Sequence, residues 1–176
     1  CRYTPGCRRV RDQLSTGTIG EPTRAVFTYS KPFRTNGSHL IDLARWWFGD
    51  ISTIRAAVST PSPSAFFKAG NIECIVCGIG TSNYSQLYAD VFGTNGSRHL
   101  IENIQHLVEC VAVEDPLYPG FGKLVERRRT ETEIEQALIA AVDDLLTANH
   151  QMTDPICSGR EALATLPACE EIEPKA

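Results

Sequence analysis

The part of this chain richest in chemistry runs from residue 34 to residue 50, RTNGSHLIDLARWWFGD. It holds both tryptophans, one of the four histidines and two aspartates. His39 stands where an apolar helix would begin, and the positive end of a helix dipole favours a neutral imidazole. A neutral ring can take a proton from a substrate hydroxyl. His39 is therefore a candidate acid/base, although a structural histidine near a core would leave the same pattern.

Asp42 follows His39 by one helical turn. Its charge would raise the pKa of the ring, and its carboxylate could hold the ring by a hydrogen bond. The pair is thus the first arrangement to look for in the folded chain.

The composition excludes several classes of protein. The 176 residues, 42% hydrophobic and 22% charged, fit one globular domain over residues 1–176. A net charge of −4 argues against nucleic-acid binding, and Arg127–Arg129, flanked by acidic residues, is expected in a solvated loop. No apolar run is long enough to span a membrane. Seven cysteines without paired spacing predict no metal site and a reduced, cytoplasmic protein.

Periodicity predicts the elements that would position His39. A helix begins at Thr4-Pro5 and ends at Gly17, and residues 23–30 alternate as a strand. A second helix, capped by Asn36 or Ser38 and ended by Gly49, carries an apolar stripe made of Leu40, Leu43, Ala44 and Trp47.

Further along the chain, strands are expected at 51–59, 72–77 and 86–92, with one or two more over 98–112. Asn95-Gly96 predicts a hairpin turn, and residues 116–122 a loop. Residues 133–148 have the pattern of an amphipathic helix. A last helix opens at Ser158, and Pro167 should kink or end it. Its inward residues are predicted to be Ala162, Leu163 and Leu166.

Clustered strands followed by clustered helices predict an α+β fold. The expected architecture is an open, predominantly antiparallel sheet with helices packed on one face. No G-x-G-x-x-G follows a strand, so no cofactor-binding residues are predicted within this chain. Apolar residues on both faces of 72–77 and 86–92 predict a homodimer or higher homo-oligomer, with sheets packed face to face.

These segments, in this order, resemble the C-terminal domain of the Gfo/Idh/MocA family of oxidoreductases, named for glucose–fructose oxidoreductase and inositol dehydrogenase. GSHLIDLARWWFGD is similar to the family's G-x-H-x-I-D-L-x-x-W-x-x-G. VFGTNGS is similar to its G-T-x-G-S hairpin, and PICSGREALATL to its closing P-x-x-x-G-x-E-A-L-x-x-L. The resemblance implies a dihydrodipicolinate-reductase-like C-terminal domain. It also implies an N-terminal Rossmann domain, absent from this chain, that binds NAD or NADP.

By position, His39 corresponds to the family histidine that acts at the substrate hydroxyl being oxidised. The substrate is expected to be a sugar, polyol or cyclitol, and the residues expected to bind it beside His39 are Lys31, Arg34, Thr35, Asn36 and Asp42. The alternative for Lys31 and Arg34 is that they are plain surface charges. Thr35 departs from the family, which usually has an aspartate there.

Two functions follow from the resemblance. One is the substrate-binding and oligomerisation domain of an NAD(P)-dependent oxidoreductase, inactive alone. The other is a non-catalytic ligand-binding or assembly domain derived from the same family.

Overall fold

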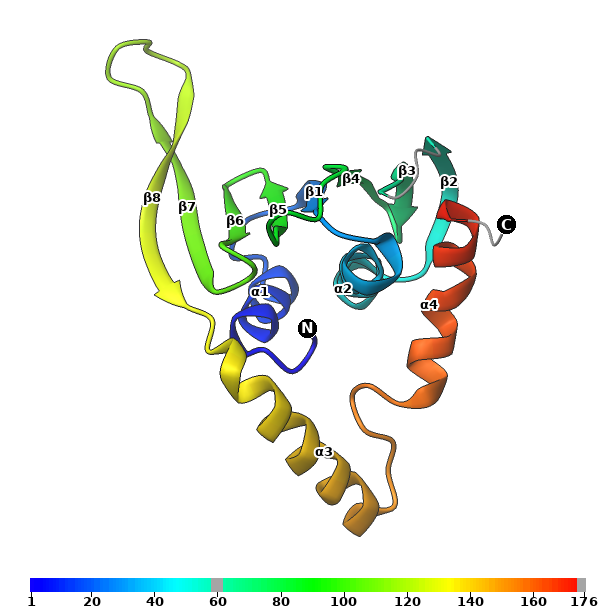
Figure 1. Ribbon diagram of the computed structural model, residues 1–176. Coiled ribbons are helices and arrows are strands. Elements are labelled where there is room, and N and C mark those ends of the chain that lie inside the picture. Colours follow the sequence, from blue (N-terminus) through cyan, green and yellow to red (C-terminus); the bar gives the residue numbers. More distant parts are fainter. Residues whose placement is uncertain (58–61, 174–176) are drawn as a thin grey trace.

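The computed structural model describes residues 1–57 and 62–173 (Figure 1). In chain order its elements are α1 (Pro5–Ser15), β1 (Pro22–Tyr29), the π-helical turn η1 (Phe33–Gly37), α2 (Ser38–Phe48), β2 (Ile51–Ala57), β3 (Ser64–Ala69), β4 (Ile72–Gly78), β5 (Leu87–Gly93), β6 (Gly96–Ile101), β7 (His106–Glu114), β8 (Gly122–Glu131), the 3-10 turn η2 (Ile134–Gln136), α3 (Ala137–Gln151) and α4 (Gly159–Ile172).

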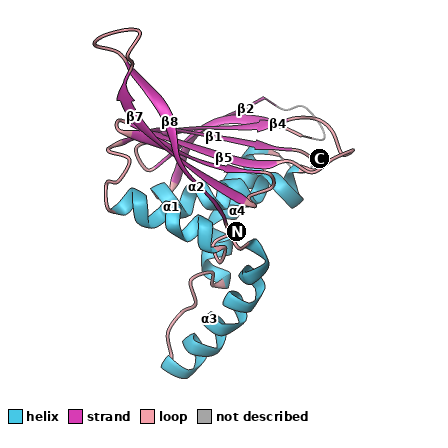
Figure 2. Ribbon diagram, turned by 90° about the vertical axis from the view of Figure 1, so that its left-hand side faces the viewer, coloured by secondary structure: helices cyan, strands magenta, loops and turns pink. Residues whose placement is uncertain are grey.

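The strands of the described residues form one sheet in the order β2-β3-β4-β1-β5-β6-β7-β8. β1 pairs with β4 in parallel, and every other neighbouring pair is antiparallel. Figure 1 shows α1, α2 and α4 beneath one face of this sheet. The predicted α+β fold with an open, predominantly antiparallel sheet is confirmed. In Figure 2, α3 extends away from the sheet on the helix side.

The core lies between the sheet and α1 and α2. Along β1, Ala25, Phe27 and Tyr29 alternate inward and are fully buried. The predicted stripe of α2 packs on them, and the rings of Phe27 and Trp47 stack at 6.4 Å between centroids. This packing fixes the face that α2 turns to the sheet.

The chain enters α2 through η1. The carbonyl of Pro32 accepts hydrogen bonds from the backbone N–H groups of Thr35 and Asn36, both at 3.1 Å. A Cβ on Gly37 would stand 2.3 Å from a ring carbon of Phe33, so only glycine fits. The predicted caps are wrong: neither Asn36 nor Ser38 caps α2, because the turn continues into the helix without a break and the Ser38 hydroxyl donates to Arg34 O instead.

Two strands were not predicted, β3 and β8. The predicted solvated loop around Arg127–Arg129 is wrong, since these residues form part of β8. β8 is exposed along almost its whole length, so no apolar alternation marks it. The predicted strand over 51–59 is observed as far as Ala57, and its last two residues lie outside the described residues.

The two C-terminal helices differ from expectation in their burial. In α3, the predicted apolar face is left uncovered, with Leu138, Val142 and Leu145 being 76%, 49% and 59% exposed.

In α4, the inward face predicted from Ala162, Leu163 and Leu166 is wrong. Those residues are exposed, and the face that packs consists of Thr165, Ala168 and Ile172. Pro167 does not end the helix, because it lies on the exposed side, where water can satisfy the carbonyl it leaves unpaired. No helix in the described parts of the chain has the length and apolarity to cross a membrane.

Candidate functional site

A pocket of about 420 Å³ lies between the N-terminal half of α2 and α4. Arg34, Ser38, His39 and Asp42 form one wall. The opposite wall comes from α4 and the segment before it, with Cys157, Ala162, Thr165, Leu166 and Cys169. One side of the pocket is therefore polar and the other is mostly apolar, as in sites that bind small organic molecules.

His39 lies in the first turn of α2, and its side chain is exposed to solvent through the pocket. Among the described residues, no side chain or backbone group forms a hydrogen bond with its ring. Desolvation by the surrounding protein lowers the pKa of His39, while the charge of Asp42 opposes that shift. The ring is therefore neutral near pH 7 and open to a ligand.

Of the other predicted site residues, the structure brings Arg34 and Asp42 to the pocket beside His39. Arg34 is 48% exposed at its side chain and pairs with Glu173, with 3.0 Å between Nε and Oε2. Lys31, Thr35 and Asn36 do not line this pocket. The Thr35 hydroxyl donates to Pro32 O at 2.9 Å, so its position four residues before His39 supplies no partner for the ring.

Asp42 is held by residues other than His39. Its two oxygens accept hydrogen bonds from Arg2, at 2.8 Å from Nε and 2.6 Å from Nη2. Thr165 Oγ1 donates to Oδ1 at 3.1 Å. Arg2 also reaches Glu161, which in turn pairs with Arg45 at 2.8 Å. This ion-pair network joins the N-terminal segment, α2 and α4 behind the pocket.

Sequence reasoning missed Arg2, Thr165, Glu161 and Cys169. The last three lie one turn apart on α4, so a helical wheel of residues 159–172 groups them on one face. Burial raises the pKa of Cys169 to about 11, which makes the thiol a neutral part of the wall. No local sequence pattern marks Arg2 as part of the site, because its partners Asp42 and Glu161 lie far away in the sequence.

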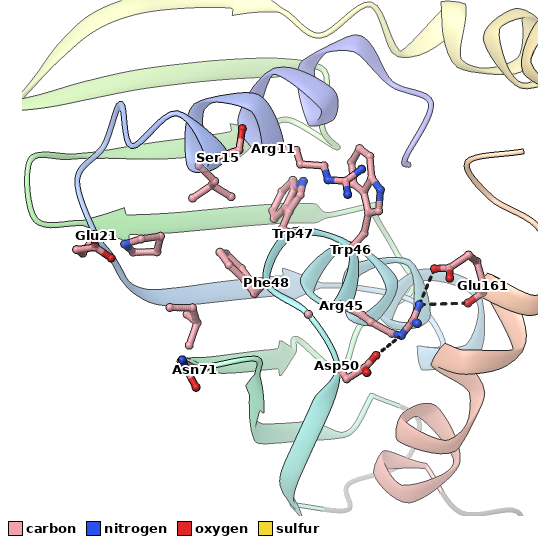
Figure 3. Close-up of a pocket in the computed structure, with 14 residues that line it drawn as sticks. Arg11, Ser15, Glu21, Arg45, Trp46, Trp47, Phe48, Asp50, Asn71 and Glu161 are labelled. Carbon is pink, nitrogen blue, oxygen red and sulfur yellow. Dashed lines mark hydrogen bonds and ion pairs between the residues drawn. The ribbon is translucent and has the colours of Figure 1, made fainter.

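A larger hollow of about 850 Å³ opens at the other end of α2, and Figure 3 shows the residues that line it. There Arg45 lies between the carboxylates of Asp50 and Glu161. The Arg11 guanidinium covers the Trp46 ring, 4.6 Å from its centroid. The hollow holds no histidine or cysteine, and its arginines are engaged by carboxylates or by the indole. We therefore place the candidate site at the smaller pocket.

A second polar chain lies on the sheet face away from the helices. Asp90 Oδ1 is 2.7 Å from His99 Nδ1, and His99 Nε2 is 2.8 Å from Ser97 Oγ. The order resembles a serine nucleophile with its base, but Ser97 has no exposed surface. No substrate can reach that hydroxyl, so the chain is structural.

No protein-family model and no curated protein matches the sequence. Solved structures do match the fold. An oxidoreductase from Agrobacterium radiobacter, in complex with NAD+, L-tartaric acid and magnesium, is 17% identical with a TM-score of 0.67; the match covers 96% of this chain and 58% of that one. Levoglucosan dehydrogenase, in complex with NADH and levoglucosan, is 15% identical with a TM-score of 0.72, over 98% and 63% of the two chains.

A third similar structure is a protein provisionally assigned as a myo-inositol dehydrogenase from Sinorhizobium meliloti 1021. It is 21% identical with a TM-score of 0.67, over 96% of this chain and 59% of its own. These structures are Gfo/Idh/MocA-type oxidoreductases, so the resemblance seen in the sequence is confirmed at the level of the fold. The chain spans about three fifths of the length of each of them.

Proposed function

We propose that this chain, with the fold of a Gfo/Idh/MocA C-terminal domain, is the substrate-binding and oligomerisation domain of an NAD(P)-dependent oxidoreductase. Its substrate would be a sugar, polyol or cyclitol, with one hydroxyl as the reacting group. The observation that carries the proposal is His39, a solvent-open imidazole without a hydrogen-bond partner among the described residues, at the mouth of a pocket. Similar folds include one solved with levoglucosan.

His39 would act as the base. A neutral imidazole accepts the proton of a bound hydroxyl, and the lowered pKa of His39 keeps the ring in that form. The exposed Arg34 guanidinium could donate to a second substrate oxygen while it retains Glu173. Ala162 and Leu166 would contact the C–H side of the ligand, which leaves its hydroxyls facing α2.

The described residues do not fit a dinucleotide. A strand followed by a glycine-rich turn and a helix is the usual pyrophosphate site. Here two strands lead into helices, β1 through η1 into α2 and β8 through η2 into α3. The first connection contains only Gly37, with Phe33 filling the space beside it, and the second contains no glycine. Under this proposal, NAD or NADP is held by a part of the protein outside this chain.

The uncovered face of α3 supports a further domain or subunit on the helix side. Five large apolar residues there are about half exposed or more: Leu138, Ile139, Val142, Leu145 and Leu146. Only Ala148 of this helix is buried. A short helix with an apolar face in water is marginal alone, so α3 gains most of its stability when that face is covered.

The outer face of the sheet supports a homodimer. Val26, Ile75 and Phe66 are neighbours across β1, β4 and β3, point away from the helices and are only partly exposed. Their apolar character is what a second sheet would cover.

The test is an assay of the longer protein that contains this chain. It is incubated with NAD or NADP and a panel of sugars, polyols and cyclitols, and reduced nicotinamide is followed by absorbance. The proposal predicts turnover of at least one substrate with one cofactor. Absence of turnover across the panel, in a protein that binds the cofactor, would favour the second function.

That second function is a non-catalytic ligand-binding or assembly domain. One observation favours it: residue 35 is a threonine bonded to Pro32, so no carboxylate at that position can work with His39. Calorimetry distinguishes the two functions, because the alternative predicts sugar binding by a protein that turns none of them over.

A further inference from the structure

Arg2 is the most deeply buried charged side chain behind the pocket, with 2% of its surface exposed. It takes both oxygens of Asp42 in a bidentate pair, and its remaining nitrogen donates to Glu161 at 3.0 Å. Thr165 adds a donor to the same carboxylate. Planar, two-point pairs of this kind fix both the direction and the charge of the acceptor.

Asp42 is also the nearest carboxylate along α2 to the candidate base, one turn after His39. Residues at this spacing share a helix face and would otherwise interact. Both oxygens of Asp42 are engaged elsewhere, and the described residues contain no bond between the carboxylate and the ring. The carboxylate could pull a proton onto His39, but it faces Arg2.

We propose that Arg2 is a positioning residue for His39: it holds the Asp42 carboxylate away from the ring and offsets part of its charge. Thr165 assists through the same carboxylate. The catalytic meaning of this role rests on the proposed function, whereas the electrostatic role does not.

The consequence is the protonation state of His39. An uncompensated carboxylate one turn away would favour imidazolium, which cannot accept a proton. Among the described residues, the other charged or titratable groups that line the pocket are Arg34 of η1, Cys157 before α4 and Cys169 of α4. The α-amino group of Cys1 lies nearby, and Glu170 and Glu173 at the end of α4 lie close enough to Cys169 to act on it. The Cys169 thiol is neutral, and the Glu173 carboxylate is paired with the Arg34 guanidinium. Asp42 is thus the carboxylate whose charge would raise the pKa of His39 if Arg2 did not pair with it.

The test is an NMR titration of the histidine rings. Arg2→Gln keeps a hydrogen-bond donor toward Asp42 but removes the charge, and Arg2→Lys restores the charge. We expect the titration midpoint of His39 to rise by roughly half a pH unit in Arg2→Gln and to stay near the wild-type value in Arg2→Lys. His99 and His150 serve as internal controls, and their midpoints should not move.

A double variant shows whether Arg2 acts through Asp42. In an Asp42→Asn background, Arg2→Gln should move the His39 midpoint much less than it does alone. An equal rise in both backgrounds, or no rise in Arg2→Gln, would overturn the proposal.

The wild-type protein supplies a measurement that needs no variant. Ring 15N shifts above the midpoint should report a His39 imidazole without a bond to a carboxylate. A dominant Nδ1–H tautomer with a strongly deshielded proton would instead place the ring on Asp42 and contradict the proposal. These measurements do not require turnover. If His39 titrates as described but His39→Ala leaves activity intact, only the proposed function fails.

Discussion

At the scale of single residues, the candidate site depends on how three neighbouring groups share their charges. His39 is open and neutral, Asp42 is paired with Arg2, and Arg34 is paired with Glu173 but half exposed. The carboxylate nearest in sequence therefore acts on the ring through its charge alone, because its oxygens are bonded to Arg2 and Thr165. A ligand meets an imidazole and a guanidinium, and no free carboxylate.

The first prediction concerns His39. In the longer protein, His39→Ala should lower kcat by roughly 10²- to 10⁴-fold, the usual contribution of a positioned acid/base. His150→Ala, at the exposed end of α3, is the matched control and should leave kcat unchanged. Steady-state kinetics with a substrate found in the panel measures both. Equal activity of the two variants would make His39 a structural residue.

The sequence pattern predicted some of this site and missed its support. The types and spacing of His39 and Asp42 pointed to each other, since residues three apart share a helix face. The actual partner of Asp42 is Arg2, forty residues earlier in the sequence. Local spacing carries no information about a contact of that range. The predicted hydrogen bond between Asp42 and the His39 ring is wrong, because Arg2 and Thr165 take the carboxylate oxygens.

At the scale of elements, α2 depends on the close approach at its start. Gly37→Ala would place a methyl group against the Phe33 ring and should cost about 1–3 kcal/mol of unfolding free energy. Gly159→Ala, at the first position of α4, meets nothing within 4 Å and should change stability by less than about 0.5 kcal/mol. Chemical denaturation of the two variants gives the comparison. A neutral Gly37→Ala would mean that η1 can rearrange freely.

The link between α2 and α4 should depend on pH. Arg45 and then Arg2 lower the pKa of Glu161 by hydrogen bonding. A carboxyl whose folded pKa is depressed stabilises the fold above its unfolded pKa, and the stabilisation disappears as pH falls through the folded pKa. Glu161→Gln should therefore lower Tm at pH 7, and the difference from wild type should vanish well below pH ~4. Glu171→Gln, on the exposed side of α4, is the control. A difference that persists in acid would exclude this ion pair as its cause.

The elements that the sequence predicted well are those with one buried face. β1 alternates between core and outer face, and α2 and α1 show their stripes, so periodicity located all three. The sequence did not predict β8, because this strand lies at the sheet edge and its residues Arg127–Arg129 are exposed to water. In α4, the apolar pattern pointed to Leu163 and Leu166, whereas Thr165 is buried because its hydroxyl has Asp42 as a partner.

At the scale of the whole molecule, two broad surfaces lack a partner in the described chain: the apolar face of α3 and the outer face of the sheet. They lie on opposite sides of the molecule, as Figure 2 shows. One molecule can therefore have two neighbours at once. The proposed function uses both, with a further domain on the helix side and a second copy on the sheet.

We expect a dimer through the sheet. Val26→Glu places a charge between Ile75 and Asp90 on the outer face and should yield monomers in sedimentation velocity. Leu117→Glu, 79% exposed in the β7–β8 connection, is the control and should leave the dimer intact. A wild-type protein that is monomeric at high concentration, or a dimer lost only in Leu117→Glu, would contradict the sheet interface.

We also expect no dinucleotide binding by this chain alone. Calorimetric titration with NAD and NADP should give no saturable heat, because neither described strand-to-helix connection, β1 to α2 or β8 to α3, has a glycine-rich turn for a pyrophosphate. Micromolar affinity would contradict that prediction and require a site elsewhere on the chain.

The place of β1 in the sheet also has a consequence for how the chain reaches its folded state. This strand is in the middle of the sheet, yet its neighbours β4 and β5 are made much later, at residues 72–78 and 87–93. During synthesis, both edges of β1 therefore stay unpaired until residues 72–78 and then residues 87–93 have been made. Pairings between distant segments slow folding and expose strand edges in the meantime. We expect refolding to be slow for a domain of this size, and any C-terminal truncation before residue 93 to yield aggregates.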